Sequence, residues 1–214
     1  MSSVFRWLGF LSLLAWGCVY LALFGWFKAH SQDFIVERRS ARLCAGSACP
    51  AANLPMRWDV SAETSLPEAL IAGWGRPESD GAWSVQREAA IHLPIGRGLS
   101  GCLEVTLRMT AAGQAGQAVH VRLGGGQGEQ AKSEWWVEGQ GRQTEMRLSV
   151  PASATDERGV LRLRLMFPDA YRPAKRMHSR DTRLLGVKLS RVALEEVEYP
   201  RQRCGLATSG GTAG

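Results

Sequence analysis

The sequence predicts a mainly β protein, with a single N-terminal transmembrane helix followed by an antiparallel, jelly-roll-like β-sandwich. Three observations support this fold class. Residues 7–27 carry no charge. After Trp58, apolar and polar residues alternate in short segments, which is the period of half-buried strands. Gly-rich turns separate these segments, in a chain that has 24 glycines among 214 residues.

The first element is the apolar run WLGFLSLLAWGCVYLALFGWF, from Trp7 to Phe27. A helix of about 20 residues crosses the hydrocarbon core of a bilayer. Trp7 and Trp26 stand near the two ends, where amphipathic rings favour the headgroup zone, and Arg6 and Lys28 flank the run. We therefore assign residues 1–28 to a transmembrane anchor.

Two other interpretations of the apolar run remain. The first is a cleaved secretory signal, for which residues 29–31 offer a weak small-x-small site. The run is longer than the usual apolar region of a signal peptide, about 7–15 residues. The second is a buried helix, which the composition disfavours because its surface would be apolar all round.

The second element is a tether over residues 29–57 that contains the short loop CAGSAC. A loop of this kind can close into a disulfide, so we predict a bond between Cys44 and Cys49. A bond between Cys102 and Cys204 is conceivable, but the sequence does not determine it. Reduced thiols are the alternative. We predict no metal site and no cofactor, because no C-x-x-C or neighbouring His completes a ligand set.

Charge and cysteine usage disagree on the orientation of the anchor. Arg6 precedes the helix, whereas Lys28, Arg38, Arg39 and Arg42 follow it, so the positive-inside rule favours a cytoplasmic domain. An even number of cysteines outside the helix favours an oxidising compartment. Long domains can also translocate regardless of charge.

The third element is the sandwich, over residues 58–200. Alternation predicts strands at 87–95, 102–109, 118–124, 144–150, 160–167 and 184–199. In the last segment the apolar phase shifts by one residue after Leu189, which predicts a bulge or bend. One short helix is expected over residues 64–74, with Ser65 as its cap. Residues 201–214 form a tail that we expect to be disordered.

Basic residues alternate with apolar ones along the predicted strands, in a chain of net charge +6. This pattern places Arg108, Arg122, Arg147, Arg162 and Arg164 on outward faces. They form either a solvated basic face or a surface for anionic polymer or lipid headgroups. Nucleic acid is not an expected partner, because no zinc finger, recognition helix or basic-aromatic strip is present.

No catalytic constellation is found, and we predict that the chain is not an enzyme. The histidines, His30, His92, His120 and His178, are scattered, and His92 and His120 fall on polar phases of strands. There is no G-x-S-x-G elbow, phosphate loop, H-E-x-x-H or dinucleotide motif. Paired carboxylates such as Glu78 and Asp80 keep a glycan hydrolase as the third-ranked hypothesis.

The segment GWGRPESDGAWS, residues 73–84, offers a candidate ligand site. Sugar rings stack on Trp faces, and carboxylates accept hydroxyl hydrogen bonds, so Trp74, Trp83, Glu78 and Asp80 could form a platform. The alternative is that the tryptophans plug one end of the sandwich. In the WW pair at 135–136, adjacent strand residues face opposite sides, so at least one is expected to be exposed or to cover a second surface.

Two segments together resemble a known family. GWGRPESDGAWS and DTRLLGVKLSRVAL, residues 181–194, are similar to the opening and closing motifs of a β-sandwich accessory domain. This extracytoplasmic domain is attached to some bacterial membrane glycosyltransferases and phosphoglycerol transferases. The resemblance covers about residues 70–198 and rests on eight positions. These are Trp74, Pro77, Glu78, Gly81, Trp83, Asp181, Arg183 and Gly186.

The resemblance implies a non-catalytic accessory protein of cell-envelope polysaccharide synthesis or export, which binds glycan or docks an enzyme subunit. Together with the apolar run of residues 7–27, it implies a single-pass protein of a bacterial inner membrane with a periplasmic C-terminal domain. Envelope polysaccharide or a membrane glycosyltransferase is then the expected partner. Asp181 and Arg183 lie two apart on one strand face and are expected to pair with each other or with Glu78, as a structural lock. The alternative function is a structural scaffold with no sugar contact.

Overall fold

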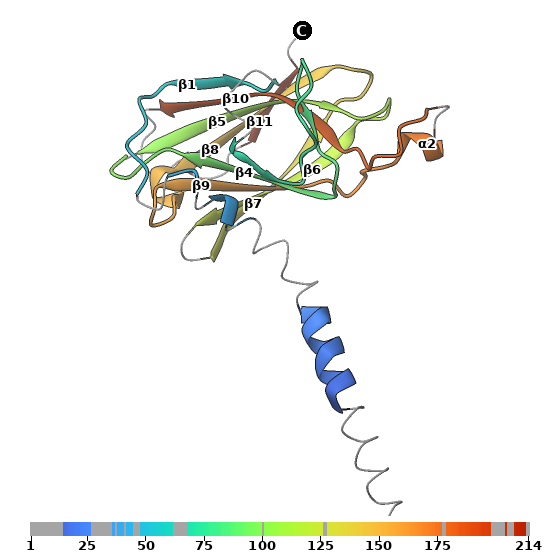
Figure 1. The fold of residues 1–214 in the computed structure, drawn as a ribbon. Helices are drawn as coiled ribbons and strands as arrows, with labels where there is room; N and C mark the ends of the chain where they lie inside the picture. Colours follow the sequence, from blue (N-terminus) through green and yellow to red (C-terminus); the bar gives the residue numbers. More distant parts are fainter. Residues whose placement is uncertain are drawn as a thin grey trace, which may run out of the picture. The chain divides into compact units, whose positions relative to one another are not determined.

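A computed structural model describes residues 15–26, 36, 38–40, 42–44, 48–61, 68–99, 101–125, 128–176, 179–197, 204 and 208–212. The chain divides into two compact units, Met1–Arg38 and Arg39–Gly214. The first unit contains a helix over residues 15–26, and the second contains two β-sheets (Figure 1).

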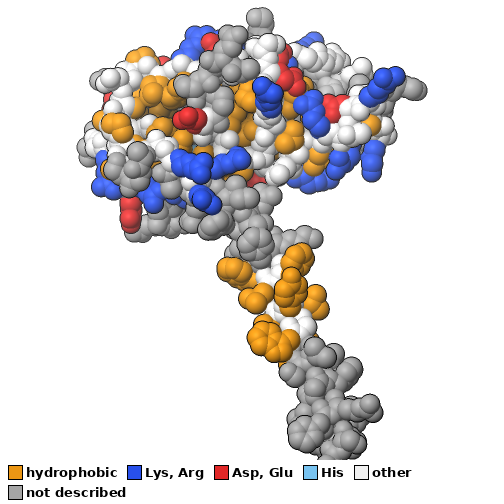
Figure 2. Space-filling view, viewed as in Figure 1, with side chains coloured by type: hydrophobic (Ala, Val, Ile, Leu, Met, Phe, Trp, Pro, Cys, Tyr) orange, Lys and Arg blue, Asp and Glu red, His pale blue; other side chains and the backbone are white. Residues whose placement is uncertain are grey.

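The helix over residues 15–26 exposes its large apolar side chains on all sides (Figure 2). Trp16 and Tyr20 are 72% exposed and Trp26 is 61% exposed. Among the residues that the structure describes, no helix is long and apolar enough to cross a membrane. The expected anchor, residues 1–28, also includes residues 1–14, Phe27 and Lys28, which lie outside the described residues.

The second unit is an antiparallel β-sandwich, as the alternation predicts. Sheet A has the order β1-β10-β5-β8-β11, and β3 also pairs with β10. Its strands are β1 (Met56–Asp59), β3 (Ala82–Trp83), β5 (Cys102–Ala111), β8 (Gln143–Pro151), β10 (Val187–Val197) and β11 (Thr208–Thr212). Sheet B has the order β2-β4-β9-β6-β7. Its strands are β2 (Leu70–Ala72), β4 (Glu88–Pro94), β6 (Gln117–Gly125), β7 (Gly128–Val137) and β9 (Val160–Met166).

The chain crosses repeatedly between the two layers. From β4 to β10, each successive strand changes sheet except for the β6–β7 hairpin, and the order β10-β5-β8 faces β4-β9-β6-β7. This strand order is compatible with jelly-roll connectivity. Figure 1 shows sheet A above sheet B, with the short helix α2 (Pro173–Arg176) in a connection. A 3-10 helix, η2 (Ala152–Ala154), follows β8.

The core lies between the sheets and is made by the inward phase of each strand. Leu103, Val105, Leu107 and Met109 of β5 are fully buried, and the residues between them are partly exposed. The phase shift predicted after Leu189 is confirmed, because the pairing of β10 with β5 shifts register between Leu189 and Arg191. Apolar burial on one face of each sheet is the main stabilising contribution to such a fold.

The helix predicted over residues 64–74 is wrong for its described part, residues 68–74, whereas residues 64–67 with the expected cap Ser65 lie outside the described residues. Residues 70–72 form β2, which pairs antiparallel with β4. Leu70 and Ile71 are both buried, so neighbouring residues of this strand are covered on both sides. A short apolar run buried on both faces has no period of two, and periodicity alone cannot distinguish it from a helix.

The tail predicted to be disordered contains a strand. Residues 208–212 form β11, which pairs with β8 from Thr208↔Leu148 to Thr212↔Thr144. Cys204 is bonded to Cys102 at the start of β5. The small, polar composition of the tail gave no strand signal, because the ladder hydrogen bonds of an edge strand involve only its backbone.

The expected tether is partly built into the sandwich. We call the described residues between Arg39 and Ala52 the strap. The Arg39 guanidinium donates to the Ile71 carbonyl at 2.7 Å, and the Ala52 N–H donates to the Ile95 carbonyl at 3.0 Å. Strand β1 then begins at Met56, inside the range expected to be a spacer. Only residues 29–38 of the expected tether belong to the first unit.

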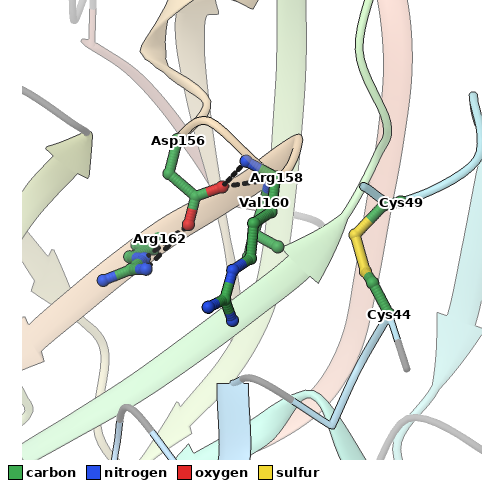
Figure 3. The surroundings of a disulfide bond; sticks show 6 residues. All are labelled: Cys44, Cys49, Asp156, Arg158, Val160 and Arg162. Carbon is green, nitrogen blue, oxygen red and sulfur yellow. Dashed lines mark hydrogen bonds and ion pairs between the residues drawn. A yellow bond between two sulfur atoms is a disulfide. The ribbon is translucent and has the colours of Figure 1, made fainter. Parts of the chain in front are cut away.

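The strap carries the bond between Cys44 and Cys49, whose Cα atoms are 5.0 Å apart. This is the pairing expected from the CAGSAC loop. Both half-cystines are buried and pack against Val160, and the Cys49 N–H donates to the Arg158 carbonyl at 2.7 Å (Figure 3). The strap is therefore joined to the turn that precedes β9.

That turn is organised by Asp156. Its carboxylate accepts the N–H groups of Arg158 at 2.9 Å and Val160 at 3.0 Å, and the Arg162 guanidinium at 2.7 Å (Figure 3). Burial acts to raise the pKa of this carboxyl, but the hydrogen bonds from Val160 and Arg162 outweigh it and lower the pKa. The turn is thus held by a charged group in its ionised form.

Candidate ligand-binding site

The predicted platform residues Trp74 and Trp83 both make internal contacts. The Trp74 ring meets Phe167 edge-on, with the centroids 6.3 Å apart, and its indole N–H donates to the Ala90 carbonyl at 3.1 Å. The Trp83 ring lies beneath the Lys188 ammonium, 5.4 Å from the ring centroid. Both side chains are half-buried. Their contacts favour the interpretation that they fix the loop to the sandwich.

The two platform carboxylates are held by cations of the closing segment. Arg183 donates to Glu78 at 3.3 Å and to Asp181 at 2.8 Å. Lys188 contacts Asp80. The hydrogen bond from Arg183 lowers the pKa of Asp181, and the one from Lys188 lowers the pKa of Asp80. Asp181, Arg183 and Glu78 therefore form the expected ion-pair lock, but Asp181 and Arg183 lie in the loop before β10 and not on a strand as predicted.

The remaining motif residues also serve the fold. Gly81 has φ +147°, and a Cβ there would lie 2.6 Å from the Leu189 carbonyl oxygen. Gly186 has no room for a Cβ either, because it would stand 2.5 Å from the Ser84 hydroxyl. Pro77 is half-buried in the loop. The opening and closing motifs thus meet over these glycines, where the two backbones approach closely.

A different place on the domain has the features of a ligand site. A pocket of about 510 Å³ lies between the β5–β6 loop, the end of β7 and the segment after β9. Sites for small ligands usually have about 300–1,000 Å³. It is lined by Ala112, Gly113, Gln114, Ala115, Gly116, Trp136, Asp169 and Tyr171. We call it the Trp136 pocket.

Trp136 dominates this pocket because its side chain is 57% exposed. Its neighbour Trp135 points the other way and is only 7% exposed, as alternation along β7 requires. The indole ring thus stands on the outer face of sheet B at the end of the strand. An exposed Trp is a frequent anchor in recognition surfaces.

Two glycines of the β5–β6 loop set the position of the aromatic walls. Gly116 has φ +82°, and a Cβ there would lie 2.8 Å from Trp136 Nε1. Gly113 has φ +90°, and a Cβ there would lie 2.4 Å from the Tyr171 hydroxyl. Because neither glycine has a side chain, both rings rest directly against the loop backbone.

The walls of the pocket are held by backbone hydrogen bonds. The Ala112 N–H donates to the Gly186 carbonyl at 2.9 Å, and the Gln140 N–H donates to the Gly113 carbonyl at 3.1 Å. Tyr171 and Leu185 exchange two backbone hydrogen bonds, at 3.0 and 2.8 Å. The pocket is therefore preorganised, which reduces the ordering cost of binding.

The sequence reasoning missed most of this pocket. The segment AAGQAG, residues 111–116, is one of the Gly-rich turns of the sequence, and no motif marks Asp169 or Tyr171 as residues of a site. One feature of the sequence does indicate the pocket. Trp136, the second Trp of the WW pair, occupies a position of its strand where the alternation places polar residues. Only the folded chain brings the other wall residues to it, from residues 112–116 of the β5–β6 loop and from Asp169 and Tyr171 after β9.

The structure offers no candidate metal centre in the part of the chain that it describes: no group of three His, Cys, Asp or Glu side chains comes together there.

His92, expected on a polar phase, does lie on the outer side of β4 but is only 3% exposed. Burial and the nearby Arg162 charge lower its pKa to about 4.

Comparison with known proteins gives no family for this chain. No family model matches it, and no curated protein matches it. Among solved structures, a ruminal GH26 endo-beta-1,4-mannanase is similar at 8% identity and TM-score 0.38, over 71% of this chain and 28% of that chain. Dimeric latent PorU from Porphyromonas gingivalis is similar at 15% identity and TM-score 0.35, over 72% of this chain and 14% of that chain. The chain thus spans a minor part of both proteins.

Proposed function

We propose that the chain is a membrane-anchored, non-catalytic accessory protein of the bacterial cell envelope that binds glycan at the Trp136 pocket. The observation that carries the proposal is the exposed Trp136 ring beside Tyr171, above a preorganised loop. The C–H face of a sugar ring stacks on such an aromatic surface. Asp169 and Gln114 supply acceptors and donors for sugar hydroxyls at the same pocket.

The lining of the pocket supports binding rather than hydrolysis. Glycoside hydrolysis usually needs two carboxyl groups on opposite sides of the scissile bond. Asp169 is the only carboxylate among the described residues that line the pocket. A single acid can hold a hydroxyl group, but it cannot supply both the proton and the nucleophile.

The anchor and its compartment are part of the proposal. The uncharged run from Trp7 to Phe27 supports membrane insertion, and the described helix within it is apolar around its surface. The bonds Cys44–Cys49 and Cys102–Cys204 support an oxidising compartment for the domain. A C-terminal reporter that is active only in the periplasm tests this orientation, and cytoplasmic activity would contradict it.

The glycan site is tested by binding of the purified full chain to an array of neutral and acidic oligosaccharides. We expect Trp136→Ala to abolish binding while the protein stays folded, because the ring is largely exposed. Gly116→Ala should weaken binding as well, because its Cβ would displace the Trp136 ring.

The matched control is Trp83→Ala, which removes the same side chain from the loop first considered as a platform. We expect this variant to lose stability and to keep its affinity for glycan. If Trp83→Ala or Trp74→Ala abolishes binding and Trp136→Ala does not, glycan binds at the loop of residues 73–84 and not at the Trp136 pocket. A wild-type chain that binds no glycan would instead support the scaffold hypothesis.

A further inference from the structure

Strand β7 forms one edge of sheet B, and this edge is long. The sheet runs in the order β2-β4-β9-β6-β7, and among the residues that the structure describes no strand continues it beyond β7. β7 has ten residues, whereas the strands at the other ends of the two sheets, β1, β2 and β11, have four, three and five. A long edge presents a row of backbone donors and acceptors with which another strand can pair.

The regular part of this edge carries two opposite charges on its outer face. The pairing of β7 with β6 is regular over residues 131–137, beyond a register shift. In this part Lys132 and Glu134 are exposed, and Ser133 between them is buried. The Glu134 side chain lies 3.7 Å from His120 and is still 69% exposed. A cation and an anion therefore stand two positions apart, on the same side of the strand.

Symmetry restricts how two copies of β7 can pair with each other. In an antiparallel ladder, two opposed residues point their backbone groups either both toward each other or both away, and this direction alternates along each strand. Two identical strands therefore pair about a two-fold axis that passes through one residue. An axis at Ser133 places Lys132 of each copy opposite Glu134 of the other. An axis at Lys132 or at Glu134 would instead oppose two like charges.

We propose that β7 pairs with β7 of a second copy of this chain, antiparallel and about a two-fold axis at Ser133. The ladder covers residues 131–135 of each copy and contains two Lys132–Glu134 pairs, and opposite charges at opposed positions stabilise a sheet. The charges favour a second copy over an unrelated strand, because the same two side chains complement themselves. The inference goes beyond the proposed function and does not depend on glycan binding.

The dimer joins the two B sheets into one and brings both Trp136 rings to the same face. Opposed residues of a ladder lie on the same side of the sheet, so the two-fold axis is perpendicular to the sheet. Trp136 lies three positions from the axis in each copy, which separates the two rings by about 20 Å along the strand direction. A polymer that spans this distance binds two pockets at once, which raises its avidity.

The test is sedimentation equilibrium of the full chain in detergent, at concentrations up to about 0.1 mM, where a Kd of micromolar order gives mostly dimer. Lys132→Glu and Glu134→Lys each oppose like charges at both pairs, so each should raise the Kd for self-association by about tenfold or more. An equimolar mixture of these two variants restores both opposite-charge pairs and should dimerise as the wild type does. Lys175→Glu, the same change at an exposed position of α2, is the matched control and should also dimerise as the wild type does.

Three results would overturn the inference. A wild-type chain that stays monomeric at every concentration excludes a second copy and leaves the edge to a strand of another protein. A dimer that Lys132→Glu does not weaken forms through another surface, such as the apolar helix over residues 15–26. If both variants lose self-association and their mixture does not recover it, Lys132 and Glu134 are not opposed across the axis, and the pairing about Ser133 is wrong.

Discussion

The side-chain oxygen of Ser84 accepts a hydrogen bond from the backbone N–H of Gly186 at 3.1 Å, across a sequence separation of 102. The same oxygen accepts the N–H of Val187 at 2.9 Å, and the Ser84 N–H donates back to the Val187 carbonyl at 2.8 Å. All of these groups are buried. One hydroxyl therefore joins the end of the GWGRPESDGAWS segment to the start of the last long strand.

Ser84→Ala is expected to destabilise the domain by about 1–3 kcal/mol, because it removes the side-chain acceptor of two buried N–H groups. The Gly186 N–H then keeps only the longer contact to the Ser84 carbonyl, at 3.4 Å. Urea unfolding followed by fluorescence measures the change in the free energy of unfolding. Ser79→Ala, at an exposed position of the same loop, is the control and should stay within about 0.5 kcal/mol of the wild type. Equal stability of the two variants would contradict the role given to Ser84.

Gly186→Ala tests the same close approach of the two motifs, with the change made in the closing motif instead of the opening one. The added Cβ would stand 2.5 Å from Ser84 Oγ and 2.9 Å from the Phe167 ring, so the strand must shift. We expect a loss of about 1–3 kcal/mol, which is typical of overpacking. Gly124→Ala is the matched control, because its Cβ would meet nothing nearer than 3.8 Å. A comparable loss at Gly124 would show that the effect is not steric.

His92 is expected to make stability depend on pH. The folded pKa is about 4, below the ordinary value of 6.5, because burial and the Arg162 charge disfavour the protonated ring. The unfolded state therefore binds the proton first as the pH falls. Stability is complete above about pH 6.5 and decreases toward pH 4, with a loss of about 2 kcal/mol between pH 7 and pH 5. Urea unfolding at the two pH values measures this loss.

His92→Gln should remove most of that pH dependence, whereas His120→Gln, at a half-exposed position of β6, should retain it. The comparison is restricted to pH 5 and above, so that the carboxylates with lowered pKa values stay ionised. If both variants keep the wild-type slope, a group other than His92 causes it.

The two disulfides should differ in their effect on stability. The Cys102–Cys204 bond closes a loop with a sequence separation of 102, and the Cys44–Cys49 bond closes one with a separation of 5. The loss of chain entropy in the unfolded state predicts that the long loop adds about 4–5 kcal/mol to the free energy of unfolding and the short loop about 2 kcal/mol. Double Cys→Ser variants of each pair, compared by melting temperature, test this order. A larger loss for the short loop would contradict it.

The Arg183 lock should contribute little to stability, in spite of its hydrogen bonds. Arg183 and Glu78 are each more than 40% exposed, and exposed ion pairs contribute about 0–1 kcal/mol. Arg183→Met should therefore cost less than Ser84→Ala. A loss of several kcal/mol, measured by urea unfolding, would show that the lock and not the buried hydroxyl holds the two motifs together.

The sequence determined the sandwich because a strand with one buried face must alternate its residues. The long strands β4, β5, β6, β8, β9 and β10 all follow from that pattern, and the bulge in β10 follows from its phase shift. The same reasoning placed the strand arginines outward. It failed at β2, where neighbouring residues are both buried, and at β11, whose pairing uses only backbone groups.

Only the tertiary structure decided which residues meet. It joined Ser84 to Gly186, engaged Glu78 and Asp80 with cations of the closing segment, and left Trp136 exposed beside Tyr171. It also aligned Arg164, Arg122 and Lys132 in one row. The physical reason is that alternation fixes the face on which a side chain lies, whereas its neighbours on that face depend on sheet order and register. These come from contacts between segments distant in sequence, and no local pattern records them.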